Sequence, residues 1–293
     1  MFMLAHLSDL HLAAPPRLAE LAGKRGLGFI NWHRGRKNIH KAEALDAITA
    51  DLKTLGVDHV AVTGDLVNLS LPDEYKLARQ WLEALGPPSE VTVIPGNHDI
   101  YVPAALNGPA TFWREYMRGD DASDPGLFPF VRRRGNVALI ALSSALPTGP
   151  FLATGRLGES QLGRFAAALN RTRQLSRIVL IHHPPVSSPR RYLRRLTDAD
   201  EFCRVLAEKG ADLVLHGHDH CRSLVWLDGP ERPIPALGAP SASARVPHHG
   251  ENAAGYNLLR IEGEAGAWRC ELLARERGSD GVIREIDRQM LRQ

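Results

Sequence analysis

Histidine, aspartate and asparagine gather in short groups at five places in the sequence. In Asp9-Leu10-His11 and in His218-Asp219-His220, one residue separates two candidate ligands, so an extended backbone points both side chains to the same side. Imidazole and carboxylate groups without cysteine favour transition metals such as manganese, iron or zinc over magnesium or calcium. The residue types and their spacing therefore predict a transition-metal site.

These groups need a framework that brings distant segments together. Short apolar runs predict buried strands at residues 3–7, 57–63, 91–94, 137–142, 178–181 and 213–215. Amphipathic patterns predict helices at residues 38–55, 72–85, 159–175 and 198–209. Beyond residue 223 only strands are predicted, at residues 224–227, 234–237, 257–261 and 268–273. The polar groups follow five of the strands, and α/β sheets bind ligands beyond the carboxyl ends of their strands, so we expect the groups to converge.

Read in order, the five groups have the patterns DxH, GD, GNHD, HxP and GHxH, and they span Asp9 to His220. Together they resemble the calcineurin-like metallophosphoesterase superfamily, and most of all its cyclic-nucleotide and glycerophosphodiester phosphodiesterase group. The resemblance implies an α/β fold, a four-layer α/β/β/α sandwich in which helices flank two mixed sheets. It also implies a hydrolase of phosphoric esters.

The resemblance further implies two metal ions, divalent or of mixed valence, with manganese, iron and zinc as the candidates. One ion would be bound by Asp9, His11, Asp65 and His220, and the other by Asp65, Asn97, His182 and His218. Asp65 would bridge the ions. The matching family positions make His98 the general acid and Asp99 its orienting partner. Two such ions lower the pKa of a bridging water, so that a hydroxide attacks the phosphorus in line.

Two adjacent histidines compete for one ligand position. Neighbouring side chains on a strand point to opposite faces, so only one of His182 and His183 is expected to bind metal. The HxP pattern favours His182. The sequence leaves both residues open.

Two basic segments bear on the substrate. Residues 17–37 form a long connection with aromatic and basic side chains, which we interpret as a lid, a peripheral membrane contact or a loop that only packs on the domain. Residues 189–195 follow the His182 group and are rich in arginine, whose planar fork suits phosphate oxygens. The candidate substrate-binding residues are Arg34, Arg36, Arg190 and Arg191.

Composition and charge narrow the class of protein. With 293 residues, 44% hydrophobic and 24% charged, the chain has the balance of a globular protein. The net charge of +3 is too small to indicate a specific nucleic-acid partner. Three distant cysteines predict no disulfide framework, which favours a cytoplasmic location, and any membrane contact would be peripheral. The oligomeric state is not indicated.

The sequence thus predicts one metallophosphoesterase domain over residues 1–273, followed by a charged tail or peripheral helix at 274–293. Its predicted activity is the hydrolysis of a small phosphodiester, either a cyclic nucleotide or a glycerophosphodiester. An alternative is a hydrolase of lipid-linked or nucleotide-sugar pyrophosphates, similar to the UDP-diacylglucosamine hydrolases, because residues 17–37 suit an amphiphilic substrate. A second alternative is a non-catalytic metal-binding scaffold, which would bind metal without turnover.

Overall fold

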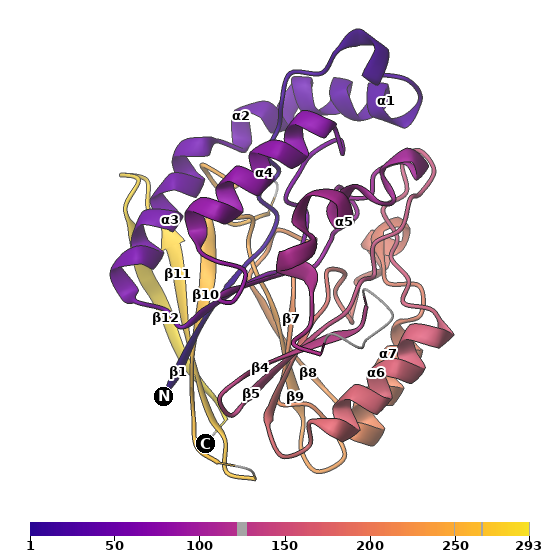
Figure 1. Ribbon diagram of the computed structural model, residues 1–293. Coiled ribbons are helices and arrows are strands. Elements are labelled where there is room, and N and C mark those ends of the chain that lie inside the picture. Colours follow the sequence, from indigo (N-terminus) through magenta and orange to yellow (C-terminus); the bar gives the residue numbers. More distant parts are fainter. Residues whose placement is uncertain (122–127, 249, 265, 293) are drawn as a thin grey trace.

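In the computed structural model, the described residues are 1–121, 128–248, 250–264 and 266–292, without the side chain of Arg36. They form four layers, in which two six-stranded mixed sheets pack face to face and helices cover the outer faces (Figure 1). The predicted α/β/β/α sandwich is confirmed.

The first sheet joins the two ends of the chain. Its strand order is β12-β11-β10-β1-β2-β3, with bounds β1 Phe2–Leu7, β2 His59–Val62, β3 Val91–Val93, β10 Gly255–Glu262, β11 Arg269–Arg277 and β12 Ile283–Arg292. β1 runs parallel to β2 and antiparallel to β10. Two helices, α3 (Ala42–Leu55) and α4 (Pro72–Leu85), cover this sheet (Figure 1).

The second sheet carries the middle of the chain. Its order is β4-β5-β6-β7-β9-β8, with bounds β4 Phe130–Arg134, β5 Val137–Ala141, β6 Ser176–Leu180, β7 Leu213–His216, β8 Ser223–Leu227 and β9 Ile234–Gly238. Its outer helices are α6 (Glu159–Arg171) and α7 (Ala199–Lys209), whose Phe165 and Phe202 rings stack at 5.5 Å. The ten predicted strands and four predicted helices all form, with small shifts at their ends.

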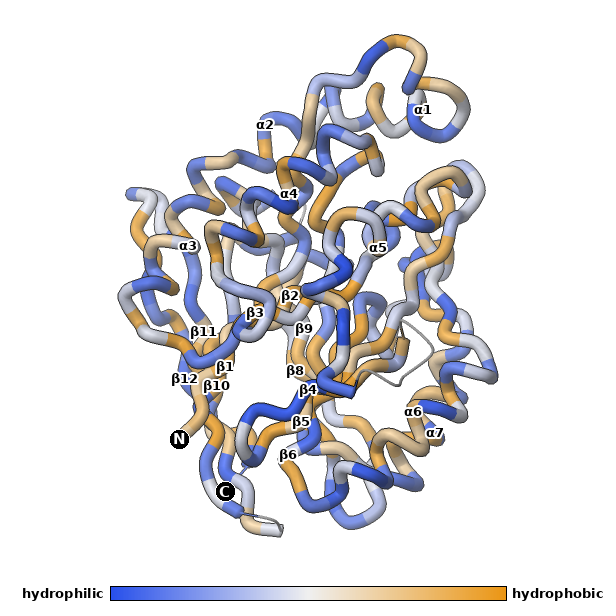
Figure 2. The backbone as a smooth tube through the Cα atoms, in the orientation of Figure 1, coloured by the Kyte–Doolittle hydropathy of each residue, from blue (hydrophilic) through white to orange (hydrophobic). Residues whose placement is uncertain are grey.

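Both faces of the central strands are buried, which explains their uninterrupted apolar sequences. On β5, Leu139 belongs to the core between the sheets, whereas Ile140 belongs to the core beneath α6 and α7. Figure 2 shows hydrophobic positions along the strands and hydrophilic positions on the outer turns of the helices. No helix of the described residues is long and apolar enough to cross a membrane.

The expectation of a tail or peripheral helix at residues 274–293 was wrong. These residues complete β11 and form β12, which pairs antiparallel with β11 at the edge of the first sheet. Ile283 and Leu291 are buried, whereas the exposed positions between them include the charged Arg284, Glu285 and Arg288. Charged side chains are common on edge strands, where they oppose pairing with other molecules.

The segment 17–37 was expected as an irregular connection but is largely helical. It contains the 3-10 turn η1 (Leu18–Glu20), helix α1 (Lys24–Asn31) and a π-helical turn η2 (Trp32–Arg36), followed by α2 (Lys37–Ile39). The remaining helical elements are α5 (Gly108–Trp113), η3 (Pro103–Ala105), η4 (Arg114–Met117) and η5 (Pro189–Arg194). In Figure 1 α1 projects beyond the body of the sandwich.

Candidate active site

Five loops at the carboxyl ends of β1, β2, β3, β6 and β7 carry the predicted metal ligands. Hydrogen bonds hold these loops together across the sandwich. The Asp9 backbone N–H donates to the Gly64 carbonyl at 2.9 Å, and the Gly217 N–H donates to the His182 carbonyl at 3.1 Å. The two sheets are joined where the His218 N–H donates to Asp9 Oδ2 at 2.9 Å. The convergence expected from the strand ends is observed.

The backbone of these loops is strained. Among the described residues, seven that are not glycine have a positive φ. Five of them are predicted ligands, with φ between 48° and 70°: Asp9, His11, Asp65, His218 and His220. Residues with side chains rarely adopt this left-handed region, and strained conformations of this kind cost about 1–3 kcal/mol each. Such conformations persist where the surrounding structure determines them, and they concentrate at functional sites.

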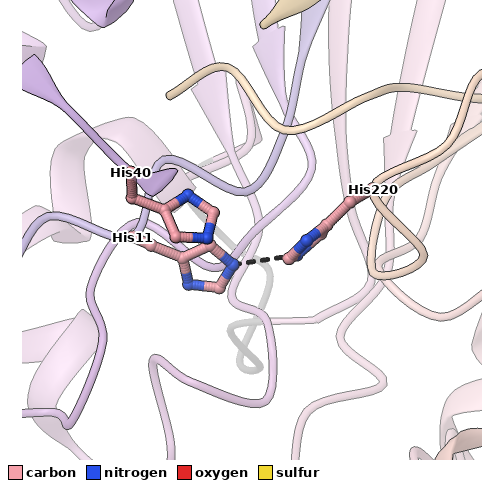
Figure 3. Close-up of side chains that lie close together, drawn as sticks. All are labelled: His11, His40 and His220. Carbon is pink, nitrogen blue, oxygen red and sulfur yellow. Dashed lines mark hydrogen bonds between the residues drawn. The ribbon is translucent and has the colours of Figure 1, made fainter. Parts of the chain in front are cut away.

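Three predicted ligands form a first cluster of donor atoms, which we name cluster 1: Asp9, His11 and His220. The Nε2 atoms of His11 and His220 are 2.9 Å apart, and the edges of the two rings point toward each other in Figure 3. Asp9 Oδ1 lies 3.2 Å from His220 Nε2 and 3.7 Å from His11 Nε2. All three side chains are buried.

The other predicted ligands form cluster 2: Asp65, Asn97, His182 and His218. Its centre is His182 Nε2, which lies 3.5 Å from Asp65 Oδ2. The same nitrogen is 3.3 Å from Asn97 Oδ1 and 3.3 Å from His218 Nδ1. A ligand atom of Asp65 also lies within 4.8 Å of those of His11 and His98, so Asp65 stands between the clusters.

Hydrogen bonding separates His182 from His183. Both ring nitrogens of His183 contact protein groups. Its Nδ1 lies 2.7 Å from Ser144 Oγ, and its Nε2 lies 3.1 Å from the Ala153 carbonyl oxygen. His182 uses only Nδ1 in this way, donating to the Thr63 carbonyl at 2.7 Å, and directs Nε2 into cluster 2. Burial also lowers the pKa of His183 to about 3. The geometry therefore favours His182 as the ligand.

The charges of the two clusters favour a cation. Burial alone would lower the pKa of His182, but Asp65, Asp9 and the Thr63 carbonyl together outweigh burial and raise this pKa to about 9. Asp9 and Glu251 have the same effect on the pKa of His220, again against burial. His218 Nε2 is buried and has no hydrogen-bond partner among the described residues. Nitrogen and oxygen donors arranged in this way fit transition-metal ions.

Similarity to known proteins extends over most of the chain. The profile of the calcineurin-like phosphoesterases matches residues 2–222. The chain belongs to this family. A probable cyclic nucleotide phosphodiesterase of Synechococcus sp. is 29% identical over 276 residues, which cover 92% of this chain and 91% of that protein. The glycerophosphodiester phosphodiesterase GpdQ of Enterobacter lignolyticus is 28% identical over 187 residues, 63% of this chain and 57% of GpdQ.

A solved structure with the same fold is the purple acid phosphatase PPD1 from yellow lupin (Lupinus luteus). The TM-score is 0.66 at 14% sequence identity, and the match covers 99% of this chain and 53% of the lupin chain. This likeness concerns the fold alone. The family and its phosphodiesterase relatives establish the chain as a metal-dependent phosphoester hydrolase.

The GNHD group of this phosphoesterase is hydrogen-bonded to the loop after β2. His98 Nδ1 donates to the Asn68 carbonyl at 2.6 Å, so Asn68 orients the ring. The Asp99 carboxylate instead accepts the backbone N–H groups of Val67, at 3.0 Å, and Gly96, at 2.8 Å. This buried carboxylate therefore holds two loop backbones together, and its role as the orienting partner of His98 stays a prediction. Burial, with the nearby Asp65 charge, raises the pKa of Asp99 to about 8.

A cavity of 280 Å³ opens onto both clusters of the phosphoesterase. Two basic side chains line it, Lys24 from α1 and Arg194 from η5. Neither is among the residues predicted to bind the substrate. The predicted Arg34 and Arg190 do not line it, and Arg191 pairs with the Asp219 carboxylate. The side chain of Arg36 lies outside the described residues.

Lys24 connects segment 17–37 to the far wall of the cavity. Its Nζ donates to Thr148 Oγ1 at 2.8 Å and to the Leu152 carbonyl at 3.3 Å, and lies 4.2 Å from the centre of the Tyr101 ring. Burial lowers the pKa of Lys24 to about 8. Of the three predicted roles of this segment, the observed contacts fit a cover over the site best.

Glu251 is a further residue that the motifs did not reveal. Its Oε2 lies 2.8 Å from His220 Nδ1 and 3.0 Å from His248 Nε2. A carboxylate that accepts the Nδ1–H of a metal-binding histidine fixes the tautomer and increases the basicity of Nε2. The sequence around Glu251 carries no family motif, so only the folded chain reveals this contact.

Proposed function

We propose that this phosphoesterase hydrolyses a phosphodiester at a centre of two transition-metal ions, with manganese, iron or zinc as the candidates. Cluster 1 with Asp65 would hold one ion, and cluster 2 would hold the other. The observation that carries the proposal is the position of Asp65 between two sets of nitrogen and oxygen donors. Two such ions activate water and balance the negative charge that develops on the phosphoryl oxygens.

His98 is proposed as the proton donor to the leaving oxygen. A carbonyl can only accept a hydrogen bond, so the contact with Asn68 keeps a proton on His98 Nδ1. The second ring nitrogen, Nε2, is then the atom that gains or loses a proton. Because His98 lines the cavity beside Asp65, a substrate phosphate held there would have its leaving oxygen within reach.

Lys24 and Arg194 are proposed to bind the substrate anion. A guanidinium fork suits two phosphate oxygens, and an ammonium group adds a point charge. Both relatives reported above are named as diesterases, which supports a cyclic nucleotide or a glycerophosphodiester as the substrate.

A second candidate function is hydrolysis of a lipid-linked or nucleotide-sugar pyrophosphate. The observation in its favour is that the exposed Phe151 lines the cavity and that three further exposed apolar residues, Leu27, Ile30 and Leu193, are sequence neighbours of lining residues, which suggests an apolar rim. Such a rim would suit the hydrophobic part of an amphiphilic substrate or a peripheral contact with a membrane.

The test is to purify the protein with Mn²⁺, measure metal per chain, and compare bis(p-nitrophenyl) phosphate with p-nitrophenyl phosphate as substrates. Two ions per chain and faster diester hydrolysis, lost in Asn97→Ala and His98→Ala, are expected. Two ions without turnover of any phosphoester would contradict the proposed activity in favour of a scaffold. Hydrolysis that depends on detergent or lipid vesicles would favour the second candidate.

A further inference from the structure

His40 lies beside cluster 1, although it belongs to no sequence motif. It connects α2 to α3, and the backbone on both sides is fixed to the loop after β9. The Lys41 N–H donates to the Ser243 carbonyl at 3.0 Å, and the Arg245 N–H donates to the Ile39 carbonyl at 2.9 Å. Between these bonds, His40 forms a bridge with Ala244. The position of His40 is therefore set by the tertiary fold.

The orientation of the His40 ring is also fixed. Its Nδ1 lies 2.8 Å from Ser243 Oγ, which leaves Nε2 on the opposite edge of the ring. The neighbouring Ser241 donates through Oγ to the Asp9 carbonyl at 2.6 Å. The same short loop therefore positions both His40 and the cluster 1 residue Asp9.

The ring lies close to the cluster 1 histidines. Its centroid is 4.7 Å from that of His11 and 5.7 Å from that of His220, and Figure 3 shows the three rings grouped together. One ligand atom from each of the three residues lies within 4.8 Å of the others. Imidazole nitrogens that share a metal ion at about 2.1 Å lie roughly 3 Å or more apart, which matches the 2.9 Å between His11 and His220.

We infer that His40 is a further ligand of the metal ion at cluster 1. This inference rests on the proposed two-metal function. The ion at cluster 1 then has three imidazoles and two carboxylates, whereas the ion at cluster 2 has two imidazoles, one carboxylate and one amide. The cluster 1 ion would therefore have more donors than the cluster 2 ion.

This ligand also links the cover of the cavity to the metal centre. Segment 17–37 is held at its start by Lys24, which bonds to the far wall of the cavity. Three residues past its end, His40 contacts cluster 1. Metal binding therefore anchors the end of this segment nearest α3.

The experiment is a Co²⁺ titration of the full chain, followed by visible absorption and by the metal retained after dialysis. His40→Ala and His40→Gln are compared with the wild type and with His33→Ala, which changes an exposed histidine of segment 17–37. We expect both His40 variants to bind one of the two ions at least about tenfold more weakly with a changed Co²⁺ spectrum, and His33→Ala to match the wild type.

Circular dichroism of the metal-free proteins identifies any variant that does not fold, and the Gln variant retains a polar group beside Ser243. Unchanged affinity and spectrum in either folded variant would overturn the His40 assignment and leave the proposed function intact. Failure of the wild type to bind two ions would overturn the proposed function as well.

Discussion

Replacing Glu251 by glutamine tests whether a carboxylate outside the metal ligands controls the metal centre. Glu251 Oε2 lies 2.8 Å from His220 Nδ1 and has a side-chain exposure of 19%, so the contact is largely screened from water. Glutamine keeps the size and one accepting oxygen but removes the negative charge. The substitution therefore removes the charge that increases the basicity of His220 Nε2.

The expected effect follows from this contact. Loss of a hydrogen-bonding partner of a metal-bound histidine weakens metal affinity by about 10–100-fold. At 1.36 kcal/mol per factor of ten, this is roughly 1.4–2.7 kcal/mol of binding free energy.

The assay is a calorimetric titration of metal-free protein with Mn²⁺, which resolves the two binding events. Glu262→Gln, at an exposed position at the end of β10, provides the control for the same chemical change elsewhere. We expect one of the two affinities to fall in Glu251→Gln and neither to change in Glu262→Gln. Equal affinities in wild type and Glu251→Gln would refute the argument that this carboxylate supports the metal site.

Two further substitutions test the cavity and the loops. Burial lowers the pKa of Lys24 to about 8, so its positive charge is present at pH 7 and is lost as the pH rises towards 9. The KM of the wild type for an anionic diester should therefore rise over this pH range. Lys24→Met should have a KM roughly fivefold higher than the wild type at pH 7, and this KM should not rise further with pH. Parallel pH profiles of KM in the two proteins would contradict this role of Lys24. In Gly217→Ala, the added Cβ would overlap Ser8 Oγ and lie 2.5 Å from Asp9 Oδ2, so we expect activity to fall about 100-fold through displacement of the carboxylate. Gly163→Ala in α6, where a Cβ meets no atom within 4 Å, is the matched control, and equal activity of the two variants would disprove the steric argument.

The sequence alone determined the framework and the position of the predicted metal ligands. Strands such as β5 and β6 are buried on both faces, and their apolar runs show this directly. The ligand groups follow strand ends, so knowledge of the strands was sufficient to predict their convergence. These signals are local, because they depend on a few consecutive residues.

Other elements have local signals that are weaker or mixed. The sequence of β12 has no strict alternation of polar and apolar residues, so it predicts a tail or helix, although Asp280-Gly281 marks the turn that pairs this strand with β11. β4 was not predicted, because three of its five residues are arginine. One of them, Arg132, is buried and donates to the carbonyls of Arg118, Pro88, Val91 and Glu115.

Only the tertiary structure decided which residues surround the predicted ligands. Asp99 follows His98 in the chain, yet Asn68, thirty positions before His98, orients that ring. His40 and Glu251 contact cluster 1, and Lys24 and Arg194 line the cavity, without any family motif around them. The physical reason is that a hydrogen bond or a charge acts over a few ångströms in space, whatever the separation along the chain. A short sequence pattern reports the residues that bind metal, and the packing of distant loops selects those that orient and cover them.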